Sequence, residues 1–574
     1  MAYSKKINRI LARNKYLLGL KSPWNSHFQL IGEYIMTRKQ NFTSDGMPGD
    51  FLTDDLFDST APRANALMAS ILLGMLWGNG AKTFKMIKPH KLKLTDGVKQ
   101  FYEKVTMIME NNLSHDESGL TLALNEYMLD EGSFGTAGIG VFENDSFPYL
   151  KIKAWDVKTM AIAEGANGCI NTIHNTKEFT VRNLVQEYGY DNIGADNKKK
   201  FDDGNETEKV KVLHVIEERL ERDPNKFGAK DMPIASIHIE LKSGKILKES
   251  GYHEMPVLVA RFYKAMGEVY GRSPGMFALP DIMEINAIWE ALTLAIEKKL
   301  SPPLGVLSDG QLGGGDINTT AGAVNVFDIS NHLNIDKPVF PLFTVGDMRE
   351  VEYLIEKLEK AIEDAFSLDR LLDLNNEKTR MTAYETSARM KLRGDSLGTL
   401  FSRQELELFT PMLNRSFNIL FRKGLFGVIA GSDEEQFILD NGGTPEYIPE
   451  EVANAIMSGE EVFEIQYVSP AKRIMQAEEV QSIMSTYEAL TMIQPISPDV
   501  ADGLNHDKAL VKLHTLTGGD STILNSIDRM KEIRETRAEA QAAERDLRHK
   551  EVLASIAQQG AQAEATLNPR SAKE

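Results

Sequence analysis

The chain has 574 residues, 42% of them hydrophobic and 26% charged, so it is long enough for several domains with a sizeable core. Its 83 acidic residues outnumber 65 basic ones, giving a net charge of −18. That balance argues against a general affinity for nucleic acid, which depends on Lys and Arg neutralising phosphates. A single cysteine, Cys169, excludes an internal disulfide and a structural zinc site and suits a reducing compartment.

The N-terminal segment resembles a basic amphipathic helix and not a secretory signal. Its first twenty residues interleave Lys and Arg with Ile and Leu, so no uninterrupted apolar core is present. The most apolar run, residues 66–77, is shorter than the roughly 20 residues that a membrane span needs. We therefore expect a soluble product made in the cytosol, without a membrane contact.

Residues 1–150 are expected to be mostly helical, and residues 133–263 mostly extended. The first part contains helical patterns, including residues 24–36, 58–76, 96–114 and 118–131. The second part has short apolar runs between Gly, Asn and Asp clusters, interrupted by one helix, TVRNLVQEYG, and a polar surface loop at residues 196–209. This pattern predicts an α+β protein, mostly helical, with an antiparallel sheet.

Two long helices follow, separated by an irregular excursion. Ser273 and Pro274 are suited to the start of the first helix, as cap and first-turn residue. Apolar residues spaced by three and four give each helix one apolar seam. The seam residues are Ile282, Ile285, Trp289, Leu292 and Ile296 in the first helix, and Val351, Ile355, Leu358, Ile362 and Ala365 in the second. Three short runs between the helices can form strands.

The second helix also carries a column of carboxylates beside its seam: Glu352, Glu356, Glu359 and Glu363. Like charges at this spacing repel one another. One interpretation is a solvated face, partly offset by Lys357 and Lys360. The other is a surface that must not hold a polyanion. The sequence leaves both open.

The C-terminal part is expected to be helical around one strand. A helix is predicted from Thr382 to about Gly424, with a kink at Pro411. The strand EVFEIQYVSPA follows, and then helices, the last beginning near Asp520. The tail after Gly560 is expected to be disordered.

The chain offers no convincing catalytic constellation. The GRSPG motif has the spacing of a hydrolase nucleophile elbow, but Pro274 lacks the N–H that the oxyanion hole requires. GNGAKT lacks the P-loop frame, and HEMPV lacks the second histidine of a zinc protease. Magnesium at Asp202 and Asp203 is only weakly indicated. We therefore expect no enzyme, no cofactor and no metal site, with a serine hydrolase using Ser273 as an alternative.

Several motifs resemble those of the head-to-tail connector, or portal, proteins of short-tailed double-stranded-DNA bacteriophages. GEVYGRSP before a long helix, then TRMTAYE, then FEIQYVSPA occur in the order found in that family. Further matches are WNSHFQLIGEYI, DSTAPRANALMASILLGML and EGSFGTAGIGVF. Together they span about residues 20 to 540, and their common order is more specific than any single motif.

The resemblance implies a ring-forming portal fold, most often a dodecamer, at a unique capsid vertex. It assigns the segments as follows: wing, 1–273; first stem helix, 274–301; clip, 302–346; second stem helix, 347–366; tunnel loop, 367–381; long helix and return to the wing, 382–470; crown and barrel helices with a disordered tail, 471–574. The implied function is a channel through which double-stranded DNA is packaged and ejected. The implied location is the virion, after assembly in the host cytoplasm.

In such a ring, the four glutamates would stack as acidic circles that repel DNA from the wall, if they face the bore. In the tunnel loop, Asn375, Asn376, Lys378 and Arg380 would touch phosphates transiently, or form an ordinary solvated loop. The implied partners are the terminase large subunit, then tail adaptor or nozzle proteins, and the major capsid and scaffolding proteins. A monomeric scaffold or adaptor protein is a further alternative.

Overall fold

The computed structural model describes the chain in ranges separated by short gaps and one longer one. These ranges are 2–43, 53–78, 83–92, 95–223, 226, 228–308, 316–328, 339–342, 346, 348–367, 398–441, 443–468, 470–495, 497–517, 523–525 and 527–567. The chain divides into two compact units. Unit 1 contains Met1–Met86, Lys104–Ile448 and Ile465–Met475, and unit 2 contains Ile87–Glu103, Pro449–Glu464 and Gln476–Glu574.

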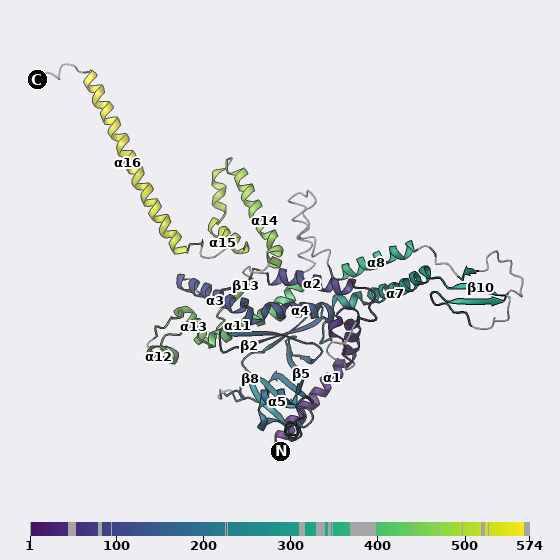
Figure 1. Cartoon of the computed structure of the whole chain (residues 1–574). Helices are drawn as coiled ribbons and strands as arrows, with labels where there is room; N and C mark the ends of the chain where they lie inside the picture. The colour runs from purple at the N-terminus through teal and green to yellow at the C-terminus, as the bar shows by residue number, and fades with distance from the viewer. Residues whose placement is uncertain are drawn as a thin grey trace. The chain divides into compact units, whose positions relative to one another are not determined.

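The structure confirms a mixed helical and strand protein (Figure 1). In the first half, the helices are α1 (Ala2–Tyr34), α2 (Thr60–Leu76), α3 (Asp96–Ser114), α4 (Leu120–Phe134), α5 (Val181–Tyr188) and α6 (Ala195–Asp202). The strands are β1 (Phe84–Ile87), β2 (Thr136–Glu143), β3 (Leu150–Trp155), β4 (Met160–Glu164), β5 (Ile170–Thr180), β6 (Lys209–Glu218), β7 (Ile234–Glu240), β8 (Ile246–Tyr252) and β9 (Val257–Arg261). Short 3-10 helices cover Thr37–Lys39, Asp116–Ser118 and Tyr190–Asn192.

Three features of this half differ from the expectation. Residues 195–202, predicted as part of a polar loop, form the helix α6. Strand β8 was not predicted, because its sequence ILKESGY lacks a strong apolar alternation. Two antiparallel sheets form instead of one, with strand orders β3-β2-β9 and β4-β5-β6-β7-β8.

The five-stranded sheet buries an apolar layer on each of its faces. On one face, Ile10 of α1 packs against β6 and β7 residues such as Leu213 and Ile237. On the other face, α5 contributes Val181 and Leu184 to a cluster with Val212 and others. The sheet is thus the centre of a three-layer arrangement, α1 on one side and α5 on the other, as two-sided burial of an alternating strand pattern requires.

Helix α1 is one continuous element where the sequence suggested two. It runs through Pro23, which lies inside the helix. Beyond that proline, Phe28 is fully buried and contacts the rings of Phe134 and Tyr270. Lys21 is also buried, and its Nζ donates to the backbone oxygen of Val157 at 2.7 Å. These contacts hold the second half of α1 against the body of unit 1, offsetting the hydrogen bond lost at the proline.

The two predicted long helices are α7 (Pro274–Leu300) and α8 (Arg349–Ala365). Between them lie β10 (Leu304–Ser308), β11 (Val324–Asp328) and β12 (Val339–Pro341), the three short strands that the sequence suggested. β10 is central, with β11 parallel and β12 antiparallel to it. Figure 1 shows α7 and α8 side by side with this small sheet beyond their ends.

A π-helix interrupts the helical segment that follows. Residues 398–404 are α-helical, Glu405–Phe409 form the π-helix η4, and α11 (Thr410–Arg422) continues. The predicted kink at Pro411 is thus a π turn just before it, and the proline occupies the first turn of α11, where its missing N–H costs little. The short helix α12 (Asp433–Asp440) completes the described part of this region in unit 1.

The remaining elements belong mainly to unit 2, except that Ile465–Met475 belongs to unit 1. They are α13 (Glu450–Ser458), β13 (Glu464–Tyr467), α14 (Pro470–Ile493), the 3-10 helix Pro498–Gly503, α15 (His506–Leu516) and α16 (Ile527–Leu567). β13 is the predicted strand, and it pairs with β1. Arg534 of α16 donates to both carboxylate oxygens of Asp507 of α15, at 2.6 and 2.8 Å. α16 begins later than predicted and continues past Gly560 to Leu567, where disorder was expected.

Candidate functional site: the paired helices α7 and α8

Helix α7 begins at a buried cap that also fixes it to the body of unit 1. The Ser273 hydroxyl accepts a hydrogen bond from the Met276 backbone N–H at 2.9 Å. The same hydroxyl donates to the backbone oxygen of Ser133 at 2.6 Å. Ser273 is fully buried, and both of these partners are backbone groups. The serine therefore acts as a helix cap, and the hydrolase alternative gains no support.

The apolar seams of α7 and α8 form the contact between the helices. Ile355, Leu358 and Ile362 of α8 are buried, as are Ile282 and Ile285 of α7. Farther along α7, Trp289 and Leu292 are half-buried and Ile296 is exposed. The predicted seams are therefore correct, but the seam of α7 is progressively less covered within one chain.

A buried asparagine ties an N-terminal segment to α7. The Asn286 Oδ1 accepts from the backbone N–H groups of Phe57 and Asp58, at 2.7 and 3.2 Å. Its Nδ2 donates to the backbone oxygen of Asp55 at 3.0 Å. The segment before α2 is thereby held beside the two long helices, which brings the Asp58 carboxylate near α8.

The four predicted glutamates lie on the face of α8 that flanks its seam. Glu352, Glu356 and Glu363 are exposed and Glu359 is half-buried. Because they are spaced by three and four residues, all four lie on neighbouring positions of one helical face. We call these four residues the acidic face.

The charges of the acidic face are not compensated within the described part of the chain. No ion pair joins any of the four carboxylates to a described residue, and this includes Lys357 and Lys360 on the same helix. Burial raises the pKa of Glu359, and the charges of Asp58, Glu363 and Glu356 raise it further. The contributions of these three carboxylates show that negative charge is concentrated around Glu359.

The other predicted site residues cannot be placed. Asn375, Asn376, Lys378 and Arg380 lie outside the described residues, as does the predicted cap at Thr382. Among the residues that are described, no cluster of His, Cys, Asp and Glu side chains is arranged to hold a metal ion. The same residues contain no helix long and apolar enough to cross a bilayer.

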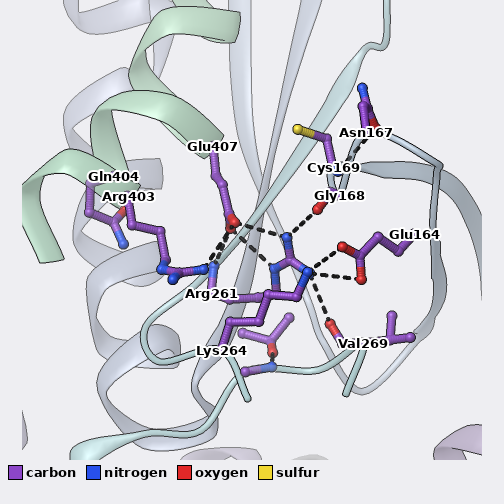
Figure 2. A network of polar contacts seen from close by, with 12 residues as sticks. Glu164, Asn167, Gly168, Cys169, Arg261, Lys264, Val269, Arg403, Gln404 and Glu407 are labelled. Atoms are coloured by element: carbon purple, nitrogen blue, oxygen red, sulfur yellow. Dashed lines mark hydrogen bonds and ion pairs between the residues drawn. The ribbon is translucent and has the colours of Figure 1, made fainter. Parts of the chain in front are cut away.

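A second group of charges, which the sequence did not indicate, is buried in unit 1 (Figure 2). The Arg261 guanidinium, 1% exposed, donates to both carboxylate oxygens of Glu407 in η4, at 2.8 and 3.2 Å. It also donates to the backbone oxygen of Gly168 at 2.8 Å and lies 3.6 Å from the Glu164 carboxylate. We call this group the Arg261 junction. It joins β9, the β4–β5 connection and the π-helix, and the positive charge of Arg261 is paired with carboxylates of the same chain.

Two polar side chains at the π-helix, Gln404 and Glu407, point into the interior of unit 1. Gln404 precedes η4 and donates to the Glu131 carboxyl group, while Tyr127 donates to Gln404 at 2.8 Å. Glu407 then reaches Arg261. Burial raises the pKa of Glu131 to about 8, so this carboxyl group is mostly protonated at neutral pH. Arg261 and Glu407 lie 146 positions apart, which is why no local pattern could predict their contact.

Comparison with known families shows the class of protein to which the chain belongs. Residues 8–524 match the family model described as bacteriophage head to tail connecting protein. The chain belongs to this family of bacteriophage head-to-tail connectors. The match covers most of the connector chain, including both long helices and the acidic face.

Two proteins of known phages that resemble this chain are named as portal proteins. The connector is 24% identical to the portal protein of Salmonella phage epsilon15 over 550 residues, which is 95% of this chain and 93% of that protein. It is 26% identical to the probable portal protein of Bordetella phage BPP-1 over 423 residues, or 73% of this chain and 75% of that protein. The resemblance inferred from the ordered motifs is therefore confirmed, and it places the connector among structural proteins of phages.

Proposed function

We propose that the connector is a portal protein, which assembles into a ring at one capsid vertex and forms the channel for double-stranded DNA. In this proposal α7 and α8 are the stem, residues 302–346 the clip, residues 367–381 the tunnel loop, and the C-terminal helices the crown and barrel. The family match supports the role between head and tail. The arrangement of α7, α8 and the small sheet supports the assignment of stem and clip.

The observation that carries the channel function is the uncompensated acidic face of α8. Exposed carboxylates in a column are unfavourable for a single chain, because neighbouring like charges repel. In a ring, each glutamate would become a circle of identical charges around the opening. Because DNA carries charge of the same sign, a duplex would be repelled by the wall and would pass without adhering.

The partly uncovered seam of α7 supports a neighbouring subunit beside the stem. Ile296 is 42% exposed, and Leu300, four residues farther along the same face, is 82% exposed. Exposed apolar residues that are neighbours on one surface are typical of a protein–protein contact. A second α7–α8 pair packed against this surface would bury them and would orient the acidic face of each subunit in the same sense.

The clip offers strand edges on which partner proteins can assemble. β11 and β12 form the two edges of the three-stranded sheet, with Val324 and Val339 exposed. Unpaired strand edges accept a further strand from another chain. We infer that the terminase large subunit docks here during packaging, and that tail adaptor or nozzle proteins replace it. Major capsid and scaffolding proteins would surround the wing in the virion, after assembly in the host cytoplasm.

The decisive experiment is to image the purified connector by electron microscopy and to measure its mass by light scattering. Rings with a central opening wide enough for a duplex are expected, with a mass about an order of magnitude above the 64.1 kDa chain. A particle with the mass of one chain would refute the ring and favour a monomeric adaptor.

A charge-reversed variant tests the channel itself. Replacing all four acidic-face glutamates by lysine is expected to preserve rings but to slow or block DNA packaging, because a basic wall would hold the duplex. Replacing Lys357 and Lys360 by glutamine provides the control on the same helix. Normal packaging by the four-lysine variant in intact rings would exclude the acidic face from the channel wall.

The proposed tunnel loop requires its own variant. Lys378→Ala combined with Arg380→Ala should leave the rings intact and impair packaging or retention of DNA, because both cations would touch phosphates as the duplex passes. Unchanged packaging in this double variant would remove the loop from the mechanism.

A further inference from the structure

One stretch of the chain carries negative charge only. Residues 424–471 contain ten Asp and Glu residues and no Lys, Arg or His. Within this stretch, residues 429–447 of unit 1 follow α11, include the helix α12, and return to the body of the unit (Figure 1). We call residues 429–447 the α12 loop.

The α12 loop is exposed along its whole described length. None of its described residues is buried, whereas α2, α4, α5, α6, α7, α8 and α11 of the same unit each bury at least one residue. The loop nevertheless contains large apolar side chains: Phe437 is 70% exposed, Tyr447 51% and Leu439 48%. Apolar side chains that lie together in the open are available to another molecule.

Hydrogen bonds, and not burial, hold the α12 loop in shape. The Val428 N–H donates to the Glu446 backbone oxygen at 2.8 Å, and the Ile448 N–H donates to the Val428 oxygen at 3.0 Å, which closes the base of the loop. Inside it, the Glu435 carboxylate accepts from the Tyr447 hydroxyl at 2.8 Å. An eight-residue helix is too short to be stable by itself in water, so these bonds keep α12 ordered. Such preorganisation lowers the entropy cost of binding a partner.

Three exposed side chains form one face of α12. Asp433, Phe437 and Asp440 are spaced by four and three residues, so the aromatic ring lies between two carboxylates, one turn away on either side. Glu434, three residues before Phe437, adds a third exposed carboxylate. No ion pair joins Asp433, Glu434 or Asp440 to a residue of the described ranges. The face therefore combines an open aromatic ring with uncompensated negative charge.

This combination selects the kind of partner. Nucleic acid carries charge of the same sign and is repelled by the face. The whole chain has a net charge of −18, which disfavours a second copy as well. The Phe437 ring attracts cations, and aromatic side chains are frequent anchors of protein interfaces. We propose that the α12 loop docks another, basic protein, in which an apolar pocket rimmed by lysine and arginine receives Phe437. This contact does not require that the connector forms a ring.

Hydrogen exchange with the full-length connector tests the proposal. The probe is a synthetic amphipathic helix with leucine on one face and lysine on the other, and mass spectrometry measures its protection of residues 429–447. Phe437→Ala is expected to need about ten times more peptide than wild type for half-maximal protection of the loop, because it removes the aromatic anchor. Tyr353→Ala is the matched control, since Tyr353 is also 70% exposed on a helix rich in acidic residues.

A second variant tests the charges separately. Asp433→Asn/Asp440→Asn is expected to weaken protection of the loop severalfold at low salt, and added salt should reduce this difference, because it screens exposed charges. Glu290→Gln/Glu297→Gln on α7 is the control, because these two exposed acids have the same seven-residue spacing and no ion pair with a described residue. Urea unfolding should be the same for all variants of the α12 loop, since the altered side chains are exposed.

The other occupants are outcomes of the same measurement. Equal protection of the loop in wild type and Phe437→Ala would overturn the proposal, and so would protection confined to residues outside 429–447. Equal protection by a peptide with glutamate in place of lysine, or by a short DNA duplex, would overturn it too. A lower mass of Phe437→Ala in light scattering would assign the loop to a second copy, against the proposal. Because the mass and the protection are measured separately, a failure of the ring and a failure of the docking site are distinguishable.

Discussion

Unit 1 contains two groups of charges that differ in how they are compensated. At the Arg261 junction, opposite charges are buried together, and Arg261 and Glu407 form a two-pronged ion pair. On the acidic face, four carboxylates of one sign line up in the open, without an ion pair to a described residue. Charges that are paired within the chain stabilise the fold. The unpaired charges of the acidic face are instead available to act on a partner outside the chain. This difference explains why a connector can carry both without conflict.

The comparison predicts that breaking the junction has the largest effect on stability. Glu407→Ala leaves the Arg261 guanidinium buried without its counter-ion, which should cost about 3–5 kcal/mol. Urea unfolding followed by tryptophan fluorescence measures this loss in unit 1, because all four tryptophans lie there: Trp24, Trp77, Trp155 and Trp289.

Arg403→Gln is the control for that measurement. Arg403 is also near Glu407, at 3.4 Å, but its side chain is 27% exposed. Its loss should cost about 1 kcal/mol or less, because water screens a partly exposed pair. An equal decrease in the free energy of unfolding in the two variants would mean that the buried Arg261–Glu407 pair contributes no more to stability than the partly exposed pair.

A smaller effect, dependent on pH, is expected at Glu131 beside the junction. Burial raises the pKa of this carboxyl group to about 8, so the folded chain holds a proton that the unfolded chain releases above its ordinary pKa of 4.5. Wild-type stability should therefore fall as pH rises between these two values, by up to about 1.4 kcal/mol per pH unit.

Glu131→Gln tests this dependence because the amide cannot ionise. The variant is expected to be more stable than wild type by about 2 kcal/mol at mildly alkaline pH, and to lose that advantage in acid. Urea unfolding at a series of pH values measures the difference. Glu126→Gln, an exposed change on the same helix α4, should leave the pH profile as it is. Parallel profiles for wild type and Glu131→Gln would contradict the prediction.

The smallest effect should come from the acidic face, and it should have the opposite sign to the junction. Glu359→Gln removes a carboxylate whose pKa is raised by burial and by neighbouring acids. Because folding disfavours its ionised form, the variant should gain about 0.5 kcal/mol at neutral pH and nothing near about pH 3. Thermal unfolding of the two proteins checks this. Glu352→Gln at the exposed end of the face should gain less, and a loss in Glu359→Gln would show that the face stabilises the single chain.

The helices were predictable to the extent that their own sequence patterns determine them. Spacings of three and four placed the seams of α7 and α8, and the serine–proline pair placed the start of α7. α6 and β8 were missed for a common reason. Each has a weak local pattern, and each is held by an element that lies just before it in the sequence: β8 pairs with β7, and α6 packs against α5.

The same limit applies to the sites. The acidic face followed from periodicity alone, but its proximity to Asp58 depends on Asn286, a contact across 228 positions. The Arg261 junction depends on strand register and on a π turn, neither of which leaves a sequence signal. The family resemblance came from the order of motifs, and it supplied the function that no local chemistry could.

Helix α1 has a mechanical consequence. At about 1.5 Å per residue, its 33 residues form a rod about 50 Å long. One end rests on the five-stranded sheet through Ile10, and the other end contacts Tyr270, four residues before α7, through Trp24 and Phe28. A displacement of the five-stranded sheet would therefore move α1 as one rigid helix and shift the residues at the start of α7.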